Sequence, residues 1–435
     1  MKALVFERNL PRFAAARVAA AFGSGRGAGV GPLRLLETDP PSLPGADWGR
    51  VTPLLSGICG SDLASLDGRS SRYFEDLVSF PFVPGHEVVG ILETAPGQPS
   101  GHASSTPAPD VGERVVLEPV LGCDARGIDP PCEACAAGLL GDCERVAFGH
   151  LSPGLQTGFC ADTGGGWSVA GLVAHASQLH RVPRELRDED AVMVEPVACA
   201  VHAVFRGGIA DGDTVAVLGA GTLGLCVVAA ITTLGATRRV PQPADLLVGA
   251  RYSHQRRLAT RLGASAACTP GQLARSVRRR SGSLSLGGPD AGSGARTLTG
   301  GADVVFDCVG SSESIAQSLA MVRPRGRLVL VGMPGKVHVD LASLWQREVE
   351  IAGSYAYGVE TPAGGDRPAR TFDLAFEVVA AHRLGDLVSA TYPIDRYEDA
   401  LAHAGAAGRR GAVKVAFDLR HSARTAAPRS EEVAP

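Results

Sequence analysis

Four of the ten cysteines in this 435-residue chain fall within one Gly- and Pro-rich segment, with the spacing Cys132-x2-Cys135-x7-Cys143 preceded by Cys123. Four thiolates can close a tetrahedral shell around Zn²⁺ and leave no position for a substrate. The segment therefore predicts a structural zinc site. Cys123 lies nine residues before Cys132, so Asp129, which is nearer, is an alternative fourth ligand.

A second set of metal-binding residue types is dispersed along the chain. It comprises Cys59 in GICGSD, His86 and Glu87 in GHEVVG, and Glu195 in VEP. A thiolate, an imidazole and a carboxylate would bind Zn²⁺ through three protein ligands and keep one position for water or substrate. Spacing alone does not bring them together, because Cys59 taken singly is more often a buried structural thiol and His86 a loop histidine with its hydrogen bonds satisfied.

A dinucleotide fingerprint follows the apolar run 214–218. Gly219 would make the turn, Gly221 would let the pyrophosphate approach the backbone, and Gly224 would let the next helix pack closely. The following apolar run, 246–249, ends in Ala250-Arg251, where an NAD site would place an acid for the ribose hydroxyls. With Arg251, Arg256 and Arg257 nearby, the pattern favours NADP over NAD; the alternative is a solvated helix face.

The elements that must position these residues change in character along the chain. Residues 1–200 are rich in short apolar runs broken by Gly and Pro, as in an irregular β domain. Residues 201–353 alternate apolar strands with helices, which predicts an α/β domain with a doubly wound parallel sheet. Residues 354–419 return to the first domain, and the polar tail 420–435 is expected to be disordered. The expected strands are 214–218, 246–249, 303–307, 327–331 and 349–352, and the expected helices are 223–234, 255–262, 312–321 and 372–381.

Composition excludes several classes of protein. The 42 Lys and Arg residues nearly balance the 45 Asp and Glu residues, for a net charge of −3, so neither a nucleic acid nor an anionic membrane is an expected partner. The uncharged run 214–237 is broken by glycines and is typical of a buried strand and helix, not of a membrane span. The chain opens without a long apolar leader, which favours the cytoplasm and cysteines that bind metal over disulfides.

In this order, GICGSD, GHEVVG, the CxxCx7C loop, VLGAGTLG and the closing VKVAFDL resemble the zinc-dependent medium-chain alcohol dehydrogenase family. Glu195-Pro196 is most similar to its polyol, glucose and threonine dehydrogenase branches. The resemblance implies a GroES-like β-barrel catalytic domain interrupted by a Rossmann domain, with the active site between them. It also implies Cys59 and His86 as zinc ligands, Glu195 and Glu87 as direct or exchanging ligands, Asp62 orienting His86, and Ser61 relaying the alcohol proton.

The resemblance further places Thr222, Leu223, Cys308, Val309 and Val331 at the cofactor, and it implies two zinc ions per chain and a homodimer or homotetramer. The expected activity is hydride transfer between NAD(P), preferably NADP, and a secondary alcohol, polyol or sugar-like hydroxyl, or the corresponding carbonyl. Two alternatives remain open: a non-catalytic NADPH-binding sensor whose thiols release zinc on oxidation, and a zinc-free quinone or enoyl reductase of the same superfamily.

Overall fold

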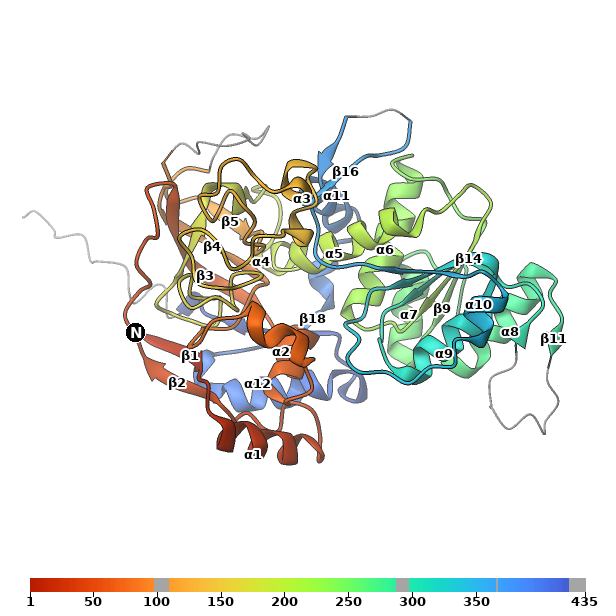
Figure 1. Cartoon of the computed structure of the whole chain (residues 1–435), viewed down its shortest axis with the longest axis horizontal. Coiled ribbons are helices and arrows are strands. Elements are labelled where there is room, and N and C mark those ends of the chain that lie inside the picture. The colour runs from red at the N-terminus through yellow and green to blue at the C-terminus, as the bar shows by residue number, and fades with distance from the viewer. Residues whose placement is uncertain (98–108, 287–296, 365–366, 422–435) are drawn as a thin grey trace, which may run out of the picture.

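The computed structural model describes residues 1–97, 109–286, 297–364 and 367–421, which form two domains lying side by side (Figure 1). Most of the polar tail 420–435, which is expected to be disordered, lies outside the described residues. No helix in the described part of the chain is long and apolar enough to cross a membrane.

The cofactor-binding domain is built on a six-stranded, entirely parallel sheet with the order β10-β9-β8-β13-β14-β15. This order confirms the doubly wound sheet, because the chain winds one way from β8 to β10 and the other way from β13 to β15. The strands are β8 (Thr214–Leu218), β9 (Asp245–Gly249), β10 (Ala266–Cys268), β13 (Ala302–Asp307), β14 (Val322–Leu330) and β15 (Glu350–Gly353). The helices are α6 (Thr222–Ala236), α7 (Ser253–Arg261), α8 (Pro270–Ser281), α9 (Ser312–Met321) and α10 (Ala342–Gln346).

The catalytic domain is built on a seven-stranded sheet with the order β18-β19-β3-β4-β5-β7, and β6 also pairs with β3. Because β19 pairs antiparallel with β3, the end of the chain returns to the first domain. The strands are β3 (Trp48–Gly57), β4 (Val88–Thr94), β5 (Arg114–Leu117), β6 (Leu172–His175), β7 (Leu179–Arg181), β18 (Val388–Tyr392) and β19 (Lys414–Asp418). The strands β1 (Lys2–Phe6) and β2 (Leu33–Glu37) form a separate antiparallel pair.

One long helix, α5 (Val194–Gly207), passes from the first domain into the second. Ten of its residues are buried, and it contacts α6 and β14 on one side and β5 on the other. Pro196 is accommodated because it lies in the first turn, where its missing N–H has no intrahelical partner. The helix α11 (Thr371–His382) packs on α5 and α6, so the apolar core of the cofactor-binding domain extends beyond residue 353.

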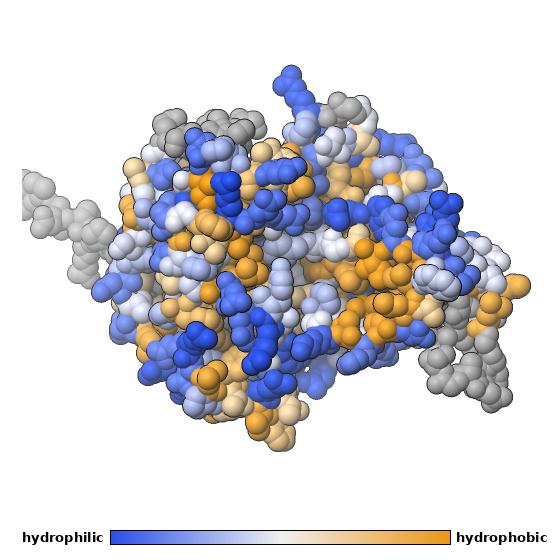
Figure 2. Space-filling model, viewed as in Figure 1, coloured by the Kyte–Doolittle hydropathy of each residue, from blue (hydrophilic) through white to orange (hydrophobic). Residues whose placement is uncertain are grey.

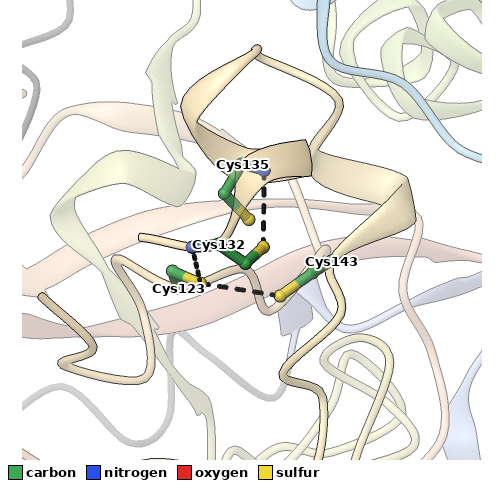
Figure 3. A group of neighbouring side chains, drawn as sticks. All are labelled: Cys123, Cys132, Cys135 and Cys143. Atoms are coloured by element: carbon green, nitrogen blue, oxygen red, sulfur yellow. Dashed lines mark hydrogen bonds between the residues drawn. The ribbon is translucent and has the colours of Figure 1, made fainter. Parts of the chain in front are cut away.

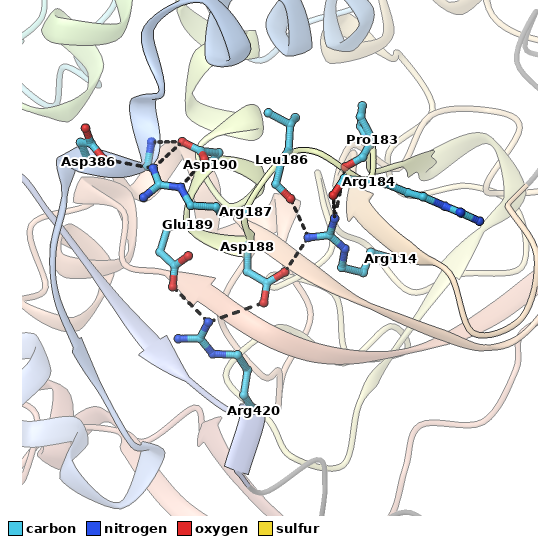
Figure 4. Close-up of polar contacts among 11 residues, drawn as sticks. Arg114, Pro183, Arg184, Leu186, Arg187, Asp188, Glu189, Asp190, Asp386 and Arg420 are labelled. Carbon is cyan, nitrogen blue, oxygen red and sulfur yellow. Dashed lines mark hydrogen bonds and ion pairs between the residues drawn. The ribbon is translucent and has the colours of Figure 1, made fainter.

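Ion pairs surround α4 (Asp188–Ala191), the short helix that leads into α5 (Figure 4). Arg114 lies 2.9 Å from Asp188, and Arg420, just beyond β19, lies 3.0 Å from Glu189. A buried network stands nearby: Glu118 accepts hydrogen bonds from Arg370 at 2.6 Å and pairs with His180 at 2.7 Å. Residues distant in sequence therefore fix the start of α5.

Near the N-terminus the chain forms a helix that the sequence patterns did not predict, α1 (Leu10–Ala20). Asn9 caps it by accepting a hydrogen bond from the Arg12 N–H. The Gly-rich stretch behind it is held by the buried carboxylate of Asp67, which accepts hydrogen bonds from the Gly25 N–H at 2.9 Å and the Ser24 hydroxyl at 2.6 Å. The remaining helices are α2 (Gly60–Leu66), α3 (Glu133–Ala136), α12 (Tyr397–Gly405) and six 3₁₀ turns: η1 (Arg72–Leu77), η2 (Leu140–Asp142), η3 (Ala176–Gln178), η4 (Leu384–Leu387), η5 (Ile394–Arg396) and η6 (Ala407–Arg410). Short pairs of strands complete the fold: β11 (Ser285–Leu286) with β12 (Thr297–Leu298), and β16 (Val359–Glu360) with β17 (Ala369–Arg370).

Candidate metal sites and cofactor site

The four cysteines of the 123–143 segment converge around one point (Figure 3). Their sulfur atoms all lie within 4.8 Å of one another, and Asp129 does not belong to the group. Cys123, Cys132 and Cys143 are buried, and Cys135 is half-buried on α3. The structure thus brings together the four thiols that the spacing singled out, with Cys123 as the fourth.

Backbone N–H groups point at three of these sulfurs. Cys132 N–H donates to Cys123 Sγ at 3.3 Å, Cys135 N–H to Cys132 Sγ at 3.5 Å, and Arg145 N–H to Cys143 Sγ at 3.4 Å. Hydrogen bonding from the Cys135 thiol, followed by the Arg145 N–H, lowers the pKa of Cys143 to about 5. Donors aimed at sulfur favour the thiolate form, so this donor set fits Zn²⁺.

The surrounding loop is held by a residue with no sequence signal, the buried Arg126. Within the described residues, its guanidinium donates to five backbone carbonyl oxygens and to no carboxylate; the oxygens belong to Leu121, Phe148, Leu151, Ser152 and Gly154. A single side chain thus fixes the loop around the four cysteines. Sequence could not indicate this, because a buried arginine usually pairs with an acid.

The second group of donors forms where β3 and β4 pair. Ser56 is opposite Val88 in the antiparallel register, so the residues just after β3 meet the residues just before β4. Cys59 caps α2, and His86 and Glu87 precede β4; their ligand atoms lie within 4.8 Å of one another. His86 and Glu87 are almost fully buried, whereas Cys59 is half-buried. The sheet register therefore assembles what spacing alone could not.

Asp62 links two of these donors. It accepts a hydrogen bond from the Cys59 N–H at 2.9 Å through Oδ2, and its Oδ1 lies 3.4 Å from Nδ1 of His86. Burial opposes a charge on His86, but the carboxylate of Asp62 outweighs it and raises the pKa of the imidazole well above its usual range. Because Asp62 faces Nδ1, Nε2 of His86 is left as the nitrogen available to a metal.

A buried lysine completes this centre and was missed by the sequence reasoning. Lys414, the first residue of β19, forms an ion pair with Glu87, and its Nζ lies 3.3 Å from the carbonyl oxygen of Ile58. A Cβ on Gly57 would overlap the Glu87 carboxylate, so a larger residue there would displace this carboxylate from Lys414. Burial disfavours the ammonium, but Glu87 raises the pKa of Lys414 above its ordinary value. In the sequence, Lys414 was singled out only as part of the segment VKVAFDL, which contributes to the family resemblance.

Glu195 lies in the first turn of α5, outside the group formed by Cys59, His86 and Glu87. It is nevertheless close enough for the charges of His86 and Glu87 to shift its pKa. Burial, together with the negative charge of Glu87, raises its pKa to about 7. One helical turn later, the Cys199 thiol donates to Glu195 Oε1 at 3.6 Å. Ser61 is half-buried on α2, two residues from Cys59. Further along α5, Nδ1 of His202 lies 2.7 Å from Oε1 of Glu360.

The fingerprint glycines occupy the turn between β8 and α6. Gly219 has φ +95°, a conformation that favours glycine. A Cβ on Gly224 would overlap the carbonyl oxygen of Gly219, whereas a Cβ on Gly221, at the N-cap of α6, would meet nothing within 4 Å. Gly224 therefore serves packing, and Gly221 leaves open space at a helix N-terminus, where a pyrophosphate fits.

The other predicted cofactor residues lie at the carboxyl ends of the parallel strands. Cys308 and Val309 follow β13, and Val331 follows β14. The buried Asp307 accepts hydrogen bonds from the N–H groups of Val309 at 2.8 Å and Gly310 at 3.0 Å, which holds this edge in place. In open α/β sheets, ligands bind at this edge, where the strand order reverses.

The arginines beyond β9 differ in their surroundings. Arg256 uses Nη1 to donate to the carbonyl oxygens of Ala250 and Arg251, each at 2.9 Å. The side chain of Arg251 is exposed. Arg256 thus holds the loop, and Arg251 is available to an anion. Thr222 Oγ1 donates to the Val413 carbonyl oxygen at 3.2 Å, and Leu223 is half-buried beside it.

Comparison with known proteins agrees with this geometry. Residues 45–184 match the family described as alcohol dehydrogenase GroES-like domain, and residues 222–364 match zinc-binding dehydrogenase. Sorbitol dehydrogenase of Bacillus subtilis (strain 168) is 27% identical over 80% of this chain and 84% of its own length. L-idonate 5-dehydrogenase of Vitis vinifera is 28% identical over 69% of this chain and 71% of its own length.

The fold recurs in the crystal structure of a zinc-binding dehydrogenase from Sinorhizobium meliloti 1021 bound to NADP. The two proteins are 24% identical with a TM-score of 0.62, over 89% of this chain and 95% of the other. The two family matches, in the order that the two domains require, cover well over half of the chain. The chain therefore belongs to the zinc-dependent medium-chain alcohol dehydrogenase family, in its polyol dehydrogenase branch.

Proposed function

We propose that this protein transfers a hydride between NADP and a secondary hydroxyl of a polyol or sugar-like substrate, at a zinc site formed by Cys59, His86 and a carboxylate. The observation that carries the proposal is the buried group of Cys59, His86 and Glu87, whose ligand atoms lie within 4.8 Å of one another. Thiolate, imidazole and carboxylate are ligands that catalytic zinc takes while keeping a position open.

The residues of the site have separate tasks. A zinc ion held there would act as a Lewis acid that lowers the pKa of the substrate hydroxyl. Asp62 orients His86 through Nδ1, and Lys414 neutralises Glu87. Because Lys414 already pairs with Glu87, Glu195 would be the carboxylate with more freedom to hold the ion, and Glu87 would be the exchanging ligand. Ser61 accepts the proton released by the hydroxyl.

We propose a second, structural zinc held by Cys123, Cys132, Cys135 and Cys143. Four thiols within 4.8 Å, with N–H donors on their sulfurs, support it. Zinc stoichiometry separates this reading from its rivals. Two zinc ions per chain are expected for the dehydrogenase, whereas one would favour the thiol sensor and none the zinc-free reductase.

NADP is the proposed cofactor because Ala250-Arg251 stands where an acid would hold the ribose hydroxyls of NAD. Arg251 would contact the 2′-phosphate, and Arg256 would hold the loop that carries it. Gly219, Gly221, Thr222, Leu223, Gly224, Cys308, Val309 and Val331 would line the rest of the cofactor site. The proposed cofactor-binding domain is 201–353, and the proposed catalytic domain is 1–200 with 354–419, whose helix α11 packs on the cofactor-binding domain.

A homodimer is the proposed assembly, in the cytoplasm. β15 is an edge strand of the parallel sheet, so its outer backbone groups have no neighbouring strand among the described residues. Figure 2 shows an apolar patch on the cofactor-binding domain. Exposed apolar side chains in the same part of the chain include Leu341, Trp345 and Ile351, at 54%, 81% and 39% exposure. A second copy would cover them, and light scattering after size exclusion would measure its presence.

The test of the activity is a screen of polyols and secondary alcohols with NADP⁺, following absorbance of the reduced cofactor. Cys59→Ala is expected to abolish turnover while cofactor affinity stays within about twofold, because Cys59 is a proposed zinc ligand and is not among the residues proposed to hold the cofactor. Cys268→Ala, a half-buried thiol on β10 outside both metal sites, is the matched control and should keep full activity. Undiminished turnover in Cys59→Ala would refute the zinc mechanism.

A further inference from the structure

A segment of the catalytic domain covers the loop that follows β9. The 3₁₀ turn η6 packs against this loop, since a Cβ on Gly408 would overlap the ring of Tyr252. A few residues later, the carbonyl oxygen of Val413 accepts the hydrogen bond from Thr222 Oγ1 at 3.2 Å. The segment 407–413 is thus fixed to the cofactor-binding domain at two points, the fingerprint helix and the loop at the ribose end of the cofactor site.

Two arginines flank this contact, one from each domain. Arg251 immediately precedes Tyr252, and Arg409 immediately follows Gly408; both side chains are exposed. In the part of the chain that the structure describes, neither side chain has an acidic partner, whereas Arg256 is engaged with two carbonyl oxygens. Two exposed arginines, each adjacent in sequence to one residue of this close contact, offer the charge and the donors that a small dianion binds.

The next residue, Arg410, provides a contrast. It is also exposed, but its charge acts on α12, where, after burial, it contributes to lowering the pKa of His403. His403 in turn hydrogen-bonds to the Tyr392 hydroxyl at 2.9 Å. Arg410 is therefore associated with the catalytic domain itself, and Arg409 is the arginine next to the Gly408–Tyr252 contact.

We propose that Arg409 binds the 2′-phosphate of NADP together with Arg251, so that the two domains share one phosphate site. This inference rests on the proposed preference for NADP. Arg409 leads through residues 411–413 into β19, whose first residue is the buried Lys414. The 2′-phosphate would consequently connect the cofactor-binding domain to the strand that supports the metal site. NAD, which has no such phosphate, cannot make this connection.

The test measures binding, not turnover, by isothermal titration calorimetry on the zinc-loaded full chain. The probes are 2′,5′-ADP, which carries the 2′-phosphate, and 5′-AMP, which does not. The parent protein is expected to bind 2′,5′-ADP at least 10-fold more tightly. Arg409→Ala should weaken 2′,5′-ADP by about 10- to 100-fold, the usual loss for a hydrogen bond to a charged group, and leave 5′-AMP unchanged. Arg410→Ala, the matched control, should change neither.

Each other outcome points to a different failure. If the parent binds the two probes equally, the NADP preference is wrong, and the shared phosphate site is wrong with it. A second outcome separates the two proposals: the parent prefers 2′,5′-ADP, and Arg251→Ala abolishes this preference whereas Arg409→Ala does not. In that case the preference for NADP is correct, but the phosphate site shared by the two domains is refuted. If Arg409→Ala weakens both probes equally, Arg409 supports the fold or the common AMP moiety, which also overturns the inference. Arg409→Gln, with a similar stem and no charge, repeats the test.

Discussion

The buried pair between Lys414 and Glu87 makes the sharpest prediction for the catalytic domain. The two side chains are 2% and 1% exposed, and Lys414 is the only side-chain partner of Glu87 in the described part of the chain. Lys414→Met preserves much of the volume of the side chain but leaves a carboxylate buried and unpaired. Removing one partner of a buried pair costs about 3–5 kcal/mol, so the unfolding equilibrium constant should rise by about 160- to 4,700-fold.

The assay is urea unfolding followed by tryptophan fluorescence, with zinc content measured on the same samples. The double variant Lys414→Met with Glu87→Gln removes both charges and is expected to recover at least half of the lost stability, since no ion is then left uncompensated. Recovery also shows that the loss in the single variant is electrostatic and does not come from packing. A single variant as stable as the parent, or a double variant no more stable than the single one, would refute the reasoning.

Three further predictions concern other parts of the molecule. Cys123→Ser is expected to lose one of two zinc ions per chain and Asp129→Asn to keep both, as measured by atomic emission; the reverse would make Asp129 the fourth ligand. Gly224→Ala should destabilise the fold by about 1–3 kcal/mol because its Cβ meets the Gly219 carbonyl, whereas Gly221→Ala should keep stability and weaken cofactor binding at least about 10-fold. Glu118→Gln tests pH dependence: burial opposes ionisation, but Arg370 and then His180 hold the pKa of this carboxyl below its ordinary 4.5. The stabilisation that comes from this lowered pKa should be complete above pH 4.5 and be lost as the pH falls through the lower folded pKa, so the stability difference between Glu118→Gln and the parent, measured by urea unfolding, should be larger at pH 7 than in acid.

Sequence patterns located the elements of the cofactor-binding domain closely. The strand expected at 214–218 and the helix expected at 312–321 have those bounds in the structure. Local signals determine such elements: β-branched runs form the buried parallel strands, and glycines mark the turns. The pattern failed for α1, whose apolar and polar residues are not segregated to opposite faces, so that no amphipathic stripe was visible.

The residues that sequence could not supply are those defined by contacts between distant segments. Lys414 and Glu87 are 327 positions apart, and a buried lysine is rare enough that no local pattern indicates one. Similarly, Cys59 and His86 meet because of the register between β3 and β4, which is a property of the folded sheet. Family resemblance supplied the identities of these donors, and the structure supplies the physical reason that they meet.

The helix α5 explains why the carboxylate Glu195 differs from the other donors. Cys59 and His86 stand at strand ends within one domain, whereas Glu195 starts a helix that packs on both domains. Glu195, Cys199 and His202 are spaced by four and three residues, so they share one face of α5. Any shift of the cofactor-binding domain that moves α5 would move Glu195 relative to Cys59 and His86. The position of this carboxylate is therefore coupled to the arrangement of the domains, while the thiol and the imidazole stay fixed on the sheet.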